Sequence, residues 1–257
     1  MLTLGISPCP NDTFAFHHLL HTSDRYDLTL ADVEELNRGH HDVTKISVAG
    51  FGHLRNRYAL LRSGGAAGFG VGPLVVATEN RDVGGRVAIP GLRTTAALLL
   101  RMLGDFETVP MRFDRIETAV LRGEVDCGVL IHEGRFTYHS KGLVKLCDLG
   151  EIWERRMHSP IPLGAIAIRR DLGEDMARRV DRDIRSSVEH ALADPSASEP
   201  FVRTHAQEMA PDVIRQHIEL YVNDYTLELD DTAVHRLLEL GEQLGLYPSS
   251  NQPVFAY

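Results

Sequence analysis

A histidine follows the apolar run Cys127–Ile131, and an acidic residue, Glu133, comes directly after it. The run has the length and composition of a buried strand, and in open α/β sheets ligands gather at the carboxyl ends of strands. An imidazole with an ordinary pKa of about 6.5 exchanges protons near neutral pH. We therefore predict that His132 acts as a general base.

A proline-rich turn after the first apolar run carries residues that cap helices. Asn11, Asp12 and Thr13 precede a stretch with helical spacing, and such side chains accept hydrogen bonds from the first N–H groups of a helix. N–H groups that stay free can bind an anionic ligand. An ordinary strand-to-helix turn, stiffened by two prolines, explains these residues as well.

Two further segments are suited to binding a carboxylate. Lys45 has hydroxyl residues on both sides, Thr44 and Ser47, at the start of an expected strand, and its ammonium can pair with a carboxylate. Thr94 and Thr95 follow a Pro-Gly turn and enter an expected helix, so hydroxyls and free amides meet there. A solvated surface lysine and helix capping without a ligand are the alternatives.

The remaining histidines and the cysteines show no pattern of a metal or redox site. His17 and His21 are four residues apart, but no His-Glu-x-x-His motif and no third ligand accompany them. Cys9, Cys127 and Cys147 are odd in number and lack Cys-x-x-Cys spacing, which argues against a disulfide framework. We therefore expect no metal ion and no cofactor, and a reducing compartment.

A glycine-rich segment, residues 62–72, precedes an apolar run. Glycine is unfavourable inside a helix or strand, so we expect a loop. It is neither a Walker loop, because no Gly-Lys-Ser/Thr follows, nor a dinucleotide fingerprint, which follows a strand instead of preceding one. A close approach of backbones near a cleft or hinge and a plain flexible loop both account for it.

The elements that must position these residues alternate between short apolar runs and segments of helical spacing, as is typical of an α/β fold. The expected strands are Leu2–Ile6, Ile46–Val48, Leu74–Ala77, Arg86–Ile89, Val109–Phe113, Cys127–Ile131 and Gly164–Ile168. The expected helices between them are Thr13–His21, Gly52–Arg62, Thr95–Leu103 and Ile116–Arg122. From Asp171 onward we expect helices alone, at Glu174–Ala193, Glu199–Met209, Pro211–Leu220 and Asp231–Leu244.

Two apolar segments are suited to cross between lobes. Residues 72–77 leave the glycine-rich segment shortly before a new strand, and residues 160–168 return from a region with its own β-α-β content. We therefore predict two α/β lobes joined by two crossover strands. The outer, larger lobe would comprise 1–78 and 162–257 with the C-terminal helices, and the inserted smaller lobe 79–161. Such a hinged pair holds a ligand at the lobe interface.

The composition excludes several classes of protein. The chain has 257 residues, 43% of them hydrophobic, and 27 Lys and Arg against 36 Asp and Glu give a net charge of -9. Scattered basic residues in an acidic chain argue against a nucleic-acid partner, and no apolar run approaches the ~18 to 20 residues that cross a bilayer. The first residues also lack the regions of a signal peptide. We expect a soluble, cytoplasmic protein without membrane insertion that binds a small molecule; no feature indicates its oligomeric state.

Together, these motifs resemble one enzyme family. They comprise Ser7-Pro8-Cys9-Pro10-Asn11-Asp12-Thr13-Phe14, Thr44-Lys45-Ile46-Ser47, Arg62-Ser63-Gly64-Gly65, Gly72-Pro73-Leu74-Val75-Val76-Ala77, Ile131-His132-Glu133-Gly134-Arg135-Phe136-Thr137-Tyr138, Pro162-Leu163-Gly164-Ala165-Ile166 and Tyr221-Val222-Asn223. The combination covers nearly the whole chain and resembles the 1,4-dihydroxy-6-naphthoate synthases of the futalosine route to menaquinone.

The resemblance implies a fold like the type 2 periplasmic binding proteins. It also implies a carbon-carbon lyase that converts cyclic dehypoxanthinyl futalosine to 1,4-dihydroxy-6-naphthoate and dihydroxyacetone without metal or cofactor. In that family the position of His132 is the proton acceptor. The resemblance further implies that the substrate, which carries an aromatic carboxylate, is contacted by Lys45, Ile46, Ser47, Thr94, Thr95 and Ala96. We add Asn11, Asp12 and Thr13 of the first turn to the predicted substrate contacts.

Two other functions are compatible with this fold. A solute-binding protein for a small carboxylate needs no catalytic base, but a secreted one carries a signal peptide or a lipobox cysteine, and we find neither before Leu2. A chorismate dehydratase of the same pathway is expected to open with a Tyr-Leu-Asn type of motif, where this chain has Cys9-Pro10-Asn11-Asp12. The synthase is therefore the favoured prediction.

Overall fold

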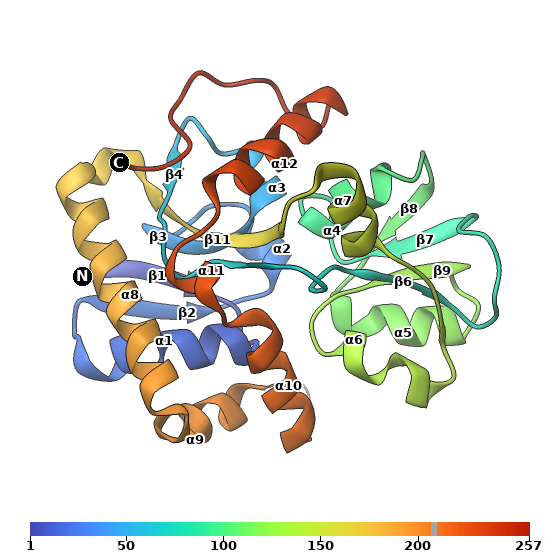
Figure 1. Ribbon diagram of the computed structural model, residues 1–257, viewed down its shortest axis with the longest axis horizontal. Helices are drawn as coiled ribbons and strands as arrows, with labels where there is room; N and C mark the ends of the chain where they lie inside the picture. The colour runs from blue at the N-terminus through green and yellow to red at the C-terminus, as the bar shows by residue number, and fades with distance from the viewer. Residues whose placement is uncertain (207–209) are drawn as a thin grey trace.

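The chain folds into two α/β lobes, each built on its own sheet (Figure 1). The structure is a computed structural model and describes residues 1–206 and 210–257. The predicted fold class, two α/β lobes, is confirmed by this division into two sheets. Both chain termini lie on the larger lobe, at the left of Figure 1.

The larger sheet has the strand order β2-β1-β3-β11-β4, with β5 paired to β11. Its strands are β1 (Leu2–Ile6), β2 (Tyr26–Leu30), β3 (Val43–Ser47), β4 (Tyr58–Leu60), β5 (Ala66–Gly68) and β11 (Ile161–Arg169). β1 runs parallel to β2 and β3, whereas β11 is antiparallel to its neighbours. β3 is buried along its whole length because helices cover both faces of the sheet.

The smaller sheet has the strand order β10-β6-β9-β7-β8. Its strands are β6 (Leu74–Ala77), β7 (Arg86–Ile89), β8 (Glu107–Pro110), β9 (Cys127–Leu130) and β10 (Val144–Asp148). β7 is parallel to both β8 and β9, while β6 is antiparallel to β9 and β10. The carboxyl ends of β7 and β9 therefore lie at one edge of this sheet.

Helices cover both sheets, and those of the last third of the chain pack mainly on the larger lobe (Figure 1). They are α1 (Pro10–Thr22), α2 (Val33–Leu36), α3 (Val48–Gly52), α4 (Thr95–Arg101), α5 (Phe113–Leu121), α6 (Gly134–Thr137), η1 (Tyr138–Lys141), α7 (Leu149–Met157), η2 (Arg170–Leu172), α8 (Glu174–Ala193), α9 (Pro195–His205), α10 (Pro211–Tyr221), α11 (Asp224–Leu227) and α12 (Asp231–Gln243). α8 illustrates why they dock: its buried residues Val180, Ile184 and Val188 recur at helical spacing and join the core that contains α1.

The hydrophobic core extends through both lobes. One cluster contains Ile46 of the larger sheet together with Val75 of β6 and Trp153 of α7. A second cluster lies between the larger sheet and helices α1 and α8, and a third lies between the smaller sheet and α5. Because apolar side chains of both sheets share the first cluster, the region between the lobes is a packed interface that can hold a site in fixed geometry.

The chain passes between the sheets before β6 and again before β11. The predicted crossing segment at residues 72–77 ends in β6, which belongs to the smaller sheet, and the returning segment forms β11 of the larger sheet. The lobe boundaries at 78/79 and 161/162 remain a prediction.

Several predicted elements differ from the structure. A helix at Gly52–Arg62 was expected, but helix α3 ends at Gly52 and strand β4 follows at Tyr58. β2, β4, β5 and β10 were not predicted. β4 and β5 have only three residues each, and in the edge strands β2 and β10 polar residues interrupt the apolar ones. The last residues of the predicted helix Glu199–Met209 lie outside the described residues.

The glycine-rich segment is confirmed as a close approach of backbones. A Cβ on Gly72 would lie 2.2 Å from Cα of Gly150, so no side chain fits there. The guanidinium of Arg135 donates to the carbonyls of Gly70 and Gly72 and to the Asp148 carboxylate. The segment is not entirely a loop, because β5 lies within it.

Within the described ranges, no helix has both the length and the apolar character that a membrane span requires.

Candidate active site

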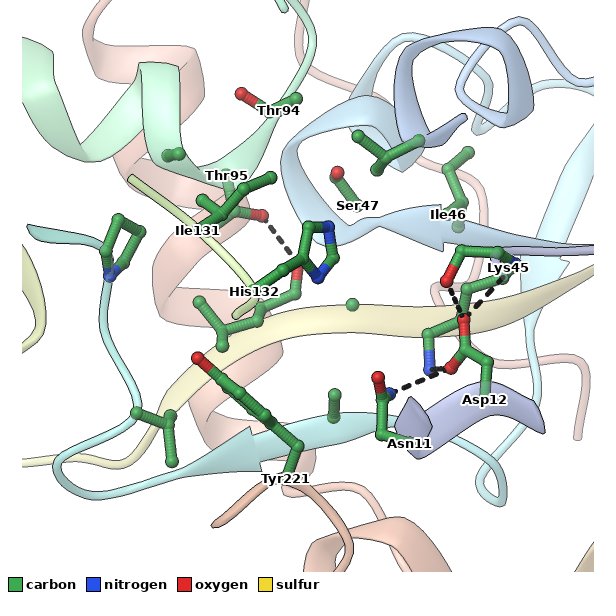
Figure 2. Close-up of a pocket in the computed structure, with 18 of the residues that line it drawn as sticks. Asn11, Asp12, Lys45, Ile46, Ser47, Thr94, Thr95, Ile131, His132 and Tyr221 are labelled. Carbon is green, nitrogen blue, oxygen red and sulfur yellow. Dashed lines mark hydrogen bonds and ion pairs between the residues drawn. The ribbon is translucent and has the colours of Figure 1, made fainter. Parts of the chain in front are cut away.

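A cavity lies between the facing edges of the two sheets (Figure 2). The parallel strands β1 and β3 end side by side, which brings Ser7 and Ser47 to one wall. On the other lobe β7 and β9 are parallel, so the turn at Thr94 and the residue His132 reach the opposite wall. The non-atom space of the cavity is about 750 Å³, part of which is open to solvent.

Most of the predicted site residues come together in this cavity. Those that line it are Asn11, Asp12, Lys45, Ile46, Ser47, Thr94, Thr95, Ala96 and His132. Thr13 is the exception: it is fully buried, and its hydroxyl donates to the carbonyls of Cys9 and Pro10. The reason is that α1 begins one turn earlier than expected, with Cys9 as its N-cap, so Thr13 faces the interior of the lobe.

His132 follows β9 in a strained conformation. Its backbone φ is 56°, in the left-handed region that non-glycine residues seldom adopt. Nδ1 lies 3.3 Å from Sγ of Cys9, which comes from the first turn of the other lobe. Phe113 packs edge-on against the ring, with 4.9 Å between centroids. Strain of this kind is concentrated at functional sites, where the surrounding structure holds the residue in place.

The protonation of His132 is set mainly by burial. Desolvation lowers the pKa of His132 to about 4, while the nearby Asp12 carboxylate raises it and the Lys45 ammonium lowers it. Burial also raises the pKa of Cys9 well above its usual value, so the sulfur next to Nδ1 is a thiol. At neutral pH His132 is therefore a neutral imidazole that can accept a proton.

Lys45 is engaged by protein groups. Its ammonium lies 2.8 Å from Oδ1 of Asp12 (Figure 2). It also donates to the carbonyl of Gly64 at 2.9 Å. Asp12 in turn accepts hydrogen bonds from the Ser7 hydroxyl at 2.7 Å and from the Asn11 amide at 2.9 Å. An ammonium has three hydrogens, so Lys45 keeps one for a ligand, and its charge is already balanced by Asp12.

Ser47 is oriented by Asn37, a fully buried residue at the end of α2. The Asn37 amide nitrogen donates to Oγ of Ser47 at 3.2 Å and to the Arg93 carbonyl at 3.3 Å, and its oxygen accepts from the Ser47 backbone N–H. Because Oγ of Ser47 acts as an acceptor toward Asn37, its own proton can be directed to a ligand. The contact with Arg93 also joins the two lobes beside Ser47.

The threonine pair begins α4. The Thr94 hydroxyl donates to the Gly91 carbonyl and accepts from the Ala97 N–H, which is the helix cap that the sequence indicated. The Thr95 hydroxyl donates to the Leu163 carbonyl at 2.8 Å and accepts from the Ala49 N–H at 3.3 Å. Both hydroxyls are thus occupied by the protein. The first N–H groups of a helix have no partner within the helix, so the amides of this turn are its donors for a ligand.

The cavity also contains residues that the sequence analysis did not select. Tyr221 and His217, one turn apart on α10, line it together with residues of the first turn. A signal was present: Ile214, His217 and Tyr221 share the buried face of α10, and polar rings on a core-facing stripe need a partner. Cys9 and Asn37 had no such signal, since their contacts join distant parts of the chain.

Across the described ranges, no three His, Cys, Asp or Glu side chains come close enough together to hold a metal ion. Among the titratable residues of the cavity, Asp12 is paired with Lys45, and His132 lies against Cys9.

Comparison with known proteins links this chain to one pathway. A family model described as menaquinone biosynthesis matches residues 2–243. The 1,4-dihydroxy-6-naphthoate synthase of Thermus thermophilus is 47% identical over 268 residues, covering 99% of this chain and 98% of its own. The enzyme of the same name from Streptomyces coelicolor is 44% identical over 276 residues and covers 100% and 98% of the two chains.

Solved structures support the fold. A crystal structure of a protein from Archaeoglobus fulgidus superposes with a TM-score of 0.90 at 36% identity and covers 95% of this chain and 98% of its own. The periplasmic aliphatic sulphonate binding protein of Escherichia coli superposes with a TM-score of 0.66 at 12% identity, covering 98% and 89%. The second likeness concerns the fold alone and confirms the expected architecture of the periplasmic binding proteins.

Proposed function

The chain belongs to the menaquinone biosynthesis family, and from this premise we propose that it is a carbon-carbon lyase that converts cyclic dehypoxanthinyl futalosine to 1,4-dihydroxy-6-naphthoate and dihydroxyacetone. The proposal is supported by relatives of nearly equal length that are named as synthases of the naphthoate. The observation that carries it is the neutral imidazole of His132, positioned in a cavity that residues of both lobes line.

His132 acts as the general base in this proposal. Losing a three-carbon fragment and forming an aromatic ring require that a proton leaves the substrate. In the tautomer whose Nδ1–H donates to the sulfur of Cys9, Nε2 carries no hydrogen and is the nitrogen available to take that proton. The left-handed backbone of His132 and the ring of Phe113 hold the imidazole in one orientation, which favours proton transfer in a fixed geometry.

The aromatic carboxylate is held at the other side of the cavity. Ser47 offers its hydroxyl proton, oriented by Asn37, and the first turn of α4 offers the backbone amides of Thr95 and Ala96. Asn37 contacts both Ser47 and the residue before Thr94, so these donors lie near each other. Hydrogen bonds from fixed donors to a carboxylate are charge-assisted and therefore strong.

Lys45 contributes through its one remaining hydrogen. Its pairing with Asp12 makes the two residues together neutral, so Lys45 binds a developing negative charge on a substrate oxygen in preference to a full second carboxylate. Asn11, whose amide donates to Asp12, lies beside this pair and lines the same part of the cavity. Water excluded by the two lobes strengthens each of these interactions.

Incubation of the purified full chain with cyclic dehypoxanthinyl futalosine tests the proposal. Mass spectrometry should detect 1,4-dihydroxy-6-naphthoate and dihydroxyacetone in equal amounts. A parallel incubation with chorismate should leave chorismate intact. If the futalosine derivative binds but is recovered unchanged at all enzyme concentrations, the protein is a binding protein; if chorismate is dehydrated instead, it is the other enzyme of the fold.

A further inference from the structure

His217 is buried without a hydrogen-bond partner. It lies on α10 with none of its surface exposed, and neither Nδ1 nor Nε2 has a partner in the described part of the chain. Nearly all buried polar groups in folded proteins are hydrogen-bonded, because leaving one unpaired is unfavourable. An imidazole with two unpaired nitrogens therefore points to a partner that the protein itself does not supply.

The position of His217 indicates where that partner comes from. The ring lines the active-site cavity, and its neighbours are aromatic: Tyr221 at 4.6 Å, His132 at 6.3 Å and Phe136 at 6.3 Å between centroids. Tyr221 belongs to the same helix, whereas His132 and Phe136 follow β9 on the smaller lobe. Rings of the smaller lobe thus lie against His217, and a separation of the lobes would remove this part of its cover.

The position of His217 within the cavity indicates which part of the substrate lies next to it. In Figure 2, Tyr221 approaches the cavity from the side opposite Thr94 and Ser47, and His217 lies one turn before Tyr221. The carboxylate is proposed to bind at Ser47, and His132 lies between. A group near His217 is therefore on the far side of the reacting carbons from the carboxylate, where the three-carbon fragment leaves.

The protonation of His217 indicates the chemistry of that group. Burial and the neighbouring His132 hold the pKa of His217 well below its usual value. A neutral imidazole has one N–H donor and one acceptor nitrogen, which complements a hydroxyl, since a hydroxyl both donates and accepts. A carboxylate, which only accepts, would satisfy one nitrogen at most.

We propose that His217 binds a hydroxyl group of the polyol-derived three-carbon fragment and thereby couples closure of the lobes to the presence of substrate. The inference rests on the proposed function, because it assumes that fragment. Closing on an empty cleft buries His217 unpaired against His132 and Phe136, whereas closing on substrate pairs it. His217 is in this sense a substrate-binding residue and also a determinant of specificity against ligands that lack the fragment.

Two substitutions in the full chain test the proposed role of His217, namely His217→Phe and His217→Gln. Ile214→Val is the control, because Ile214 is buried on the same helix but does not line the cavity. Phe keeps a ring of similar size and removes both nitrogens, while Gln keeps a donor and an acceptor. The measurements are the Tm without ligand, KM and kcat for the cyclic substrate, and Kd for 1,4-dihydroxy-6-naphthoate, which lacks the fragment.

We expect His217→Phe to raise KM about tenfold and to leave the Kd of the naphthoate within about twofold of wild type. Its Tm without ligand should equal or exceed that of wild type, because an unpaired buried group has been removed. His217→Gln should restore most of the affinity for the substrate, and Ile214→Val should change neither KM nor Kd.

Two results would overturn the inference while the proposed function stands. One is a wild-type KM in His217→Phe with a lowered Tm, which would make His217 a packing residue. The other is an equal loss of affinity for substrate and naphthoate, which would place the contact on the ring system that remains. If wild-type protein forms no naphthoate at all, the proposed function has failed, and the inference fails with it.

Discussion

Replacing Asp12 by asparagine should leave Lys45 as a buried cation without an opposite charge. The two side chains are 3% and 10% exposed, and their charged atoms are 2.8 Å apart. Removing one partner of a buried ion pair costs about 3 to 5 kcal/mol. After Asp12→Asn the Lys45 ammonium keeps the Gly64 carbonyl as a full partner, so we expect a loss of unfolding free energy within that range.

Lys45→Met should cost less than Asp12→Asn. The Asp12 carboxylate would still accept from the Ser7 hydroxyl, the Ser7 N–H and the Asn11 amide, and these hydrogen bonds offset part of the loss. We expect about 1 to 3 kcal/mol for Lys45→Met. The double variant should be more stable than the sum of the single effects predicts, by about 2 kcal/mol, because neither charge is then left alone.

Urea denaturation followed by circular dichroism gives these free energies without any substrate. Glu174→Gln is the matched control, since it breaks an ion pair with Arg178 in which both side chains are about half exposed, and it should change stability by less than about 0.5 kcal/mol. If Asp12→Asn costs no more than this control, or if the single effects add in the double variant, the reasoning is refuted. Lys45 would then be free to bind the substrate carboxylate.

Three further predictions concern the reaction and the lobe interface. A base works when deprotonated, and burial lowers the pKa of His132 to about 4, so kcat/KM should stay level from neutral pH down to about 5 and fall about tenfold per pH unit below about 4. Assays stopped at fixed times and neutralised rapidly measure this pH profile. A decrease in kcat/KM centred near pH 6.5 would contradict the prediction. Thr95→Val leaves the Leu163 carbonyl and the Ala49 N–H without their partner, so it should lower the unfolding free energy by about 1 to 3 kcal/mol. Urea titrations measure this loss, and the control Thr95→Ser should stay near the wild-type stability. Equal stability of the two variants would contradict the assigned contacts. Dialysis against a chelator should leave turnover unchanged, and activity that is lost and then restored by one metal would show that the site needs an ion.

The general organisation of this molecule could be predicted because it depends on local patterns. Short apolar runs separated by helical spacing indicate an α/β fold, and the runs Leu2–Ile6, Leu74–Ala77 and Arg86–Ile89 match the strands residue for residue. His132 was selected for the same reason: the end of a strand is visible in the sequence, and such ends face the cavity.

The hydrogen bonds and ion pairs of individual side chains could not be predicted, because they join segments that only the fold brings together. Cys9 and His132 are 123 positions apart, and the Thr95 hydroxyl is used by a carbonyl 68 positions away. Lys45 and Asp12 were both predicted to contact the substrate, and in the structure they form a buried ion pair with each other. Spacing identifies residue types that can bind a ligand, whereas burial and neighbouring charges decide which of their hydrogens remain available.

A single-turnover comparison of wild type with His132→Asn tests the central claim most directly. Asparagine tolerates the left-handed backbone that His132 adopts, so the variant should fold, and its Kd for 1,4-dihydroxy-6-naphthoate should stay near the wild-type value. His139→Asn, an exposed histidine on the same lobe, is the control and should react like wild type. The account predicts that His132→Asn forms the naphthoate about 100 to 10,000 times more slowly; a folded variant that keeps more than about a tenth of the wild-type rate would contradict it.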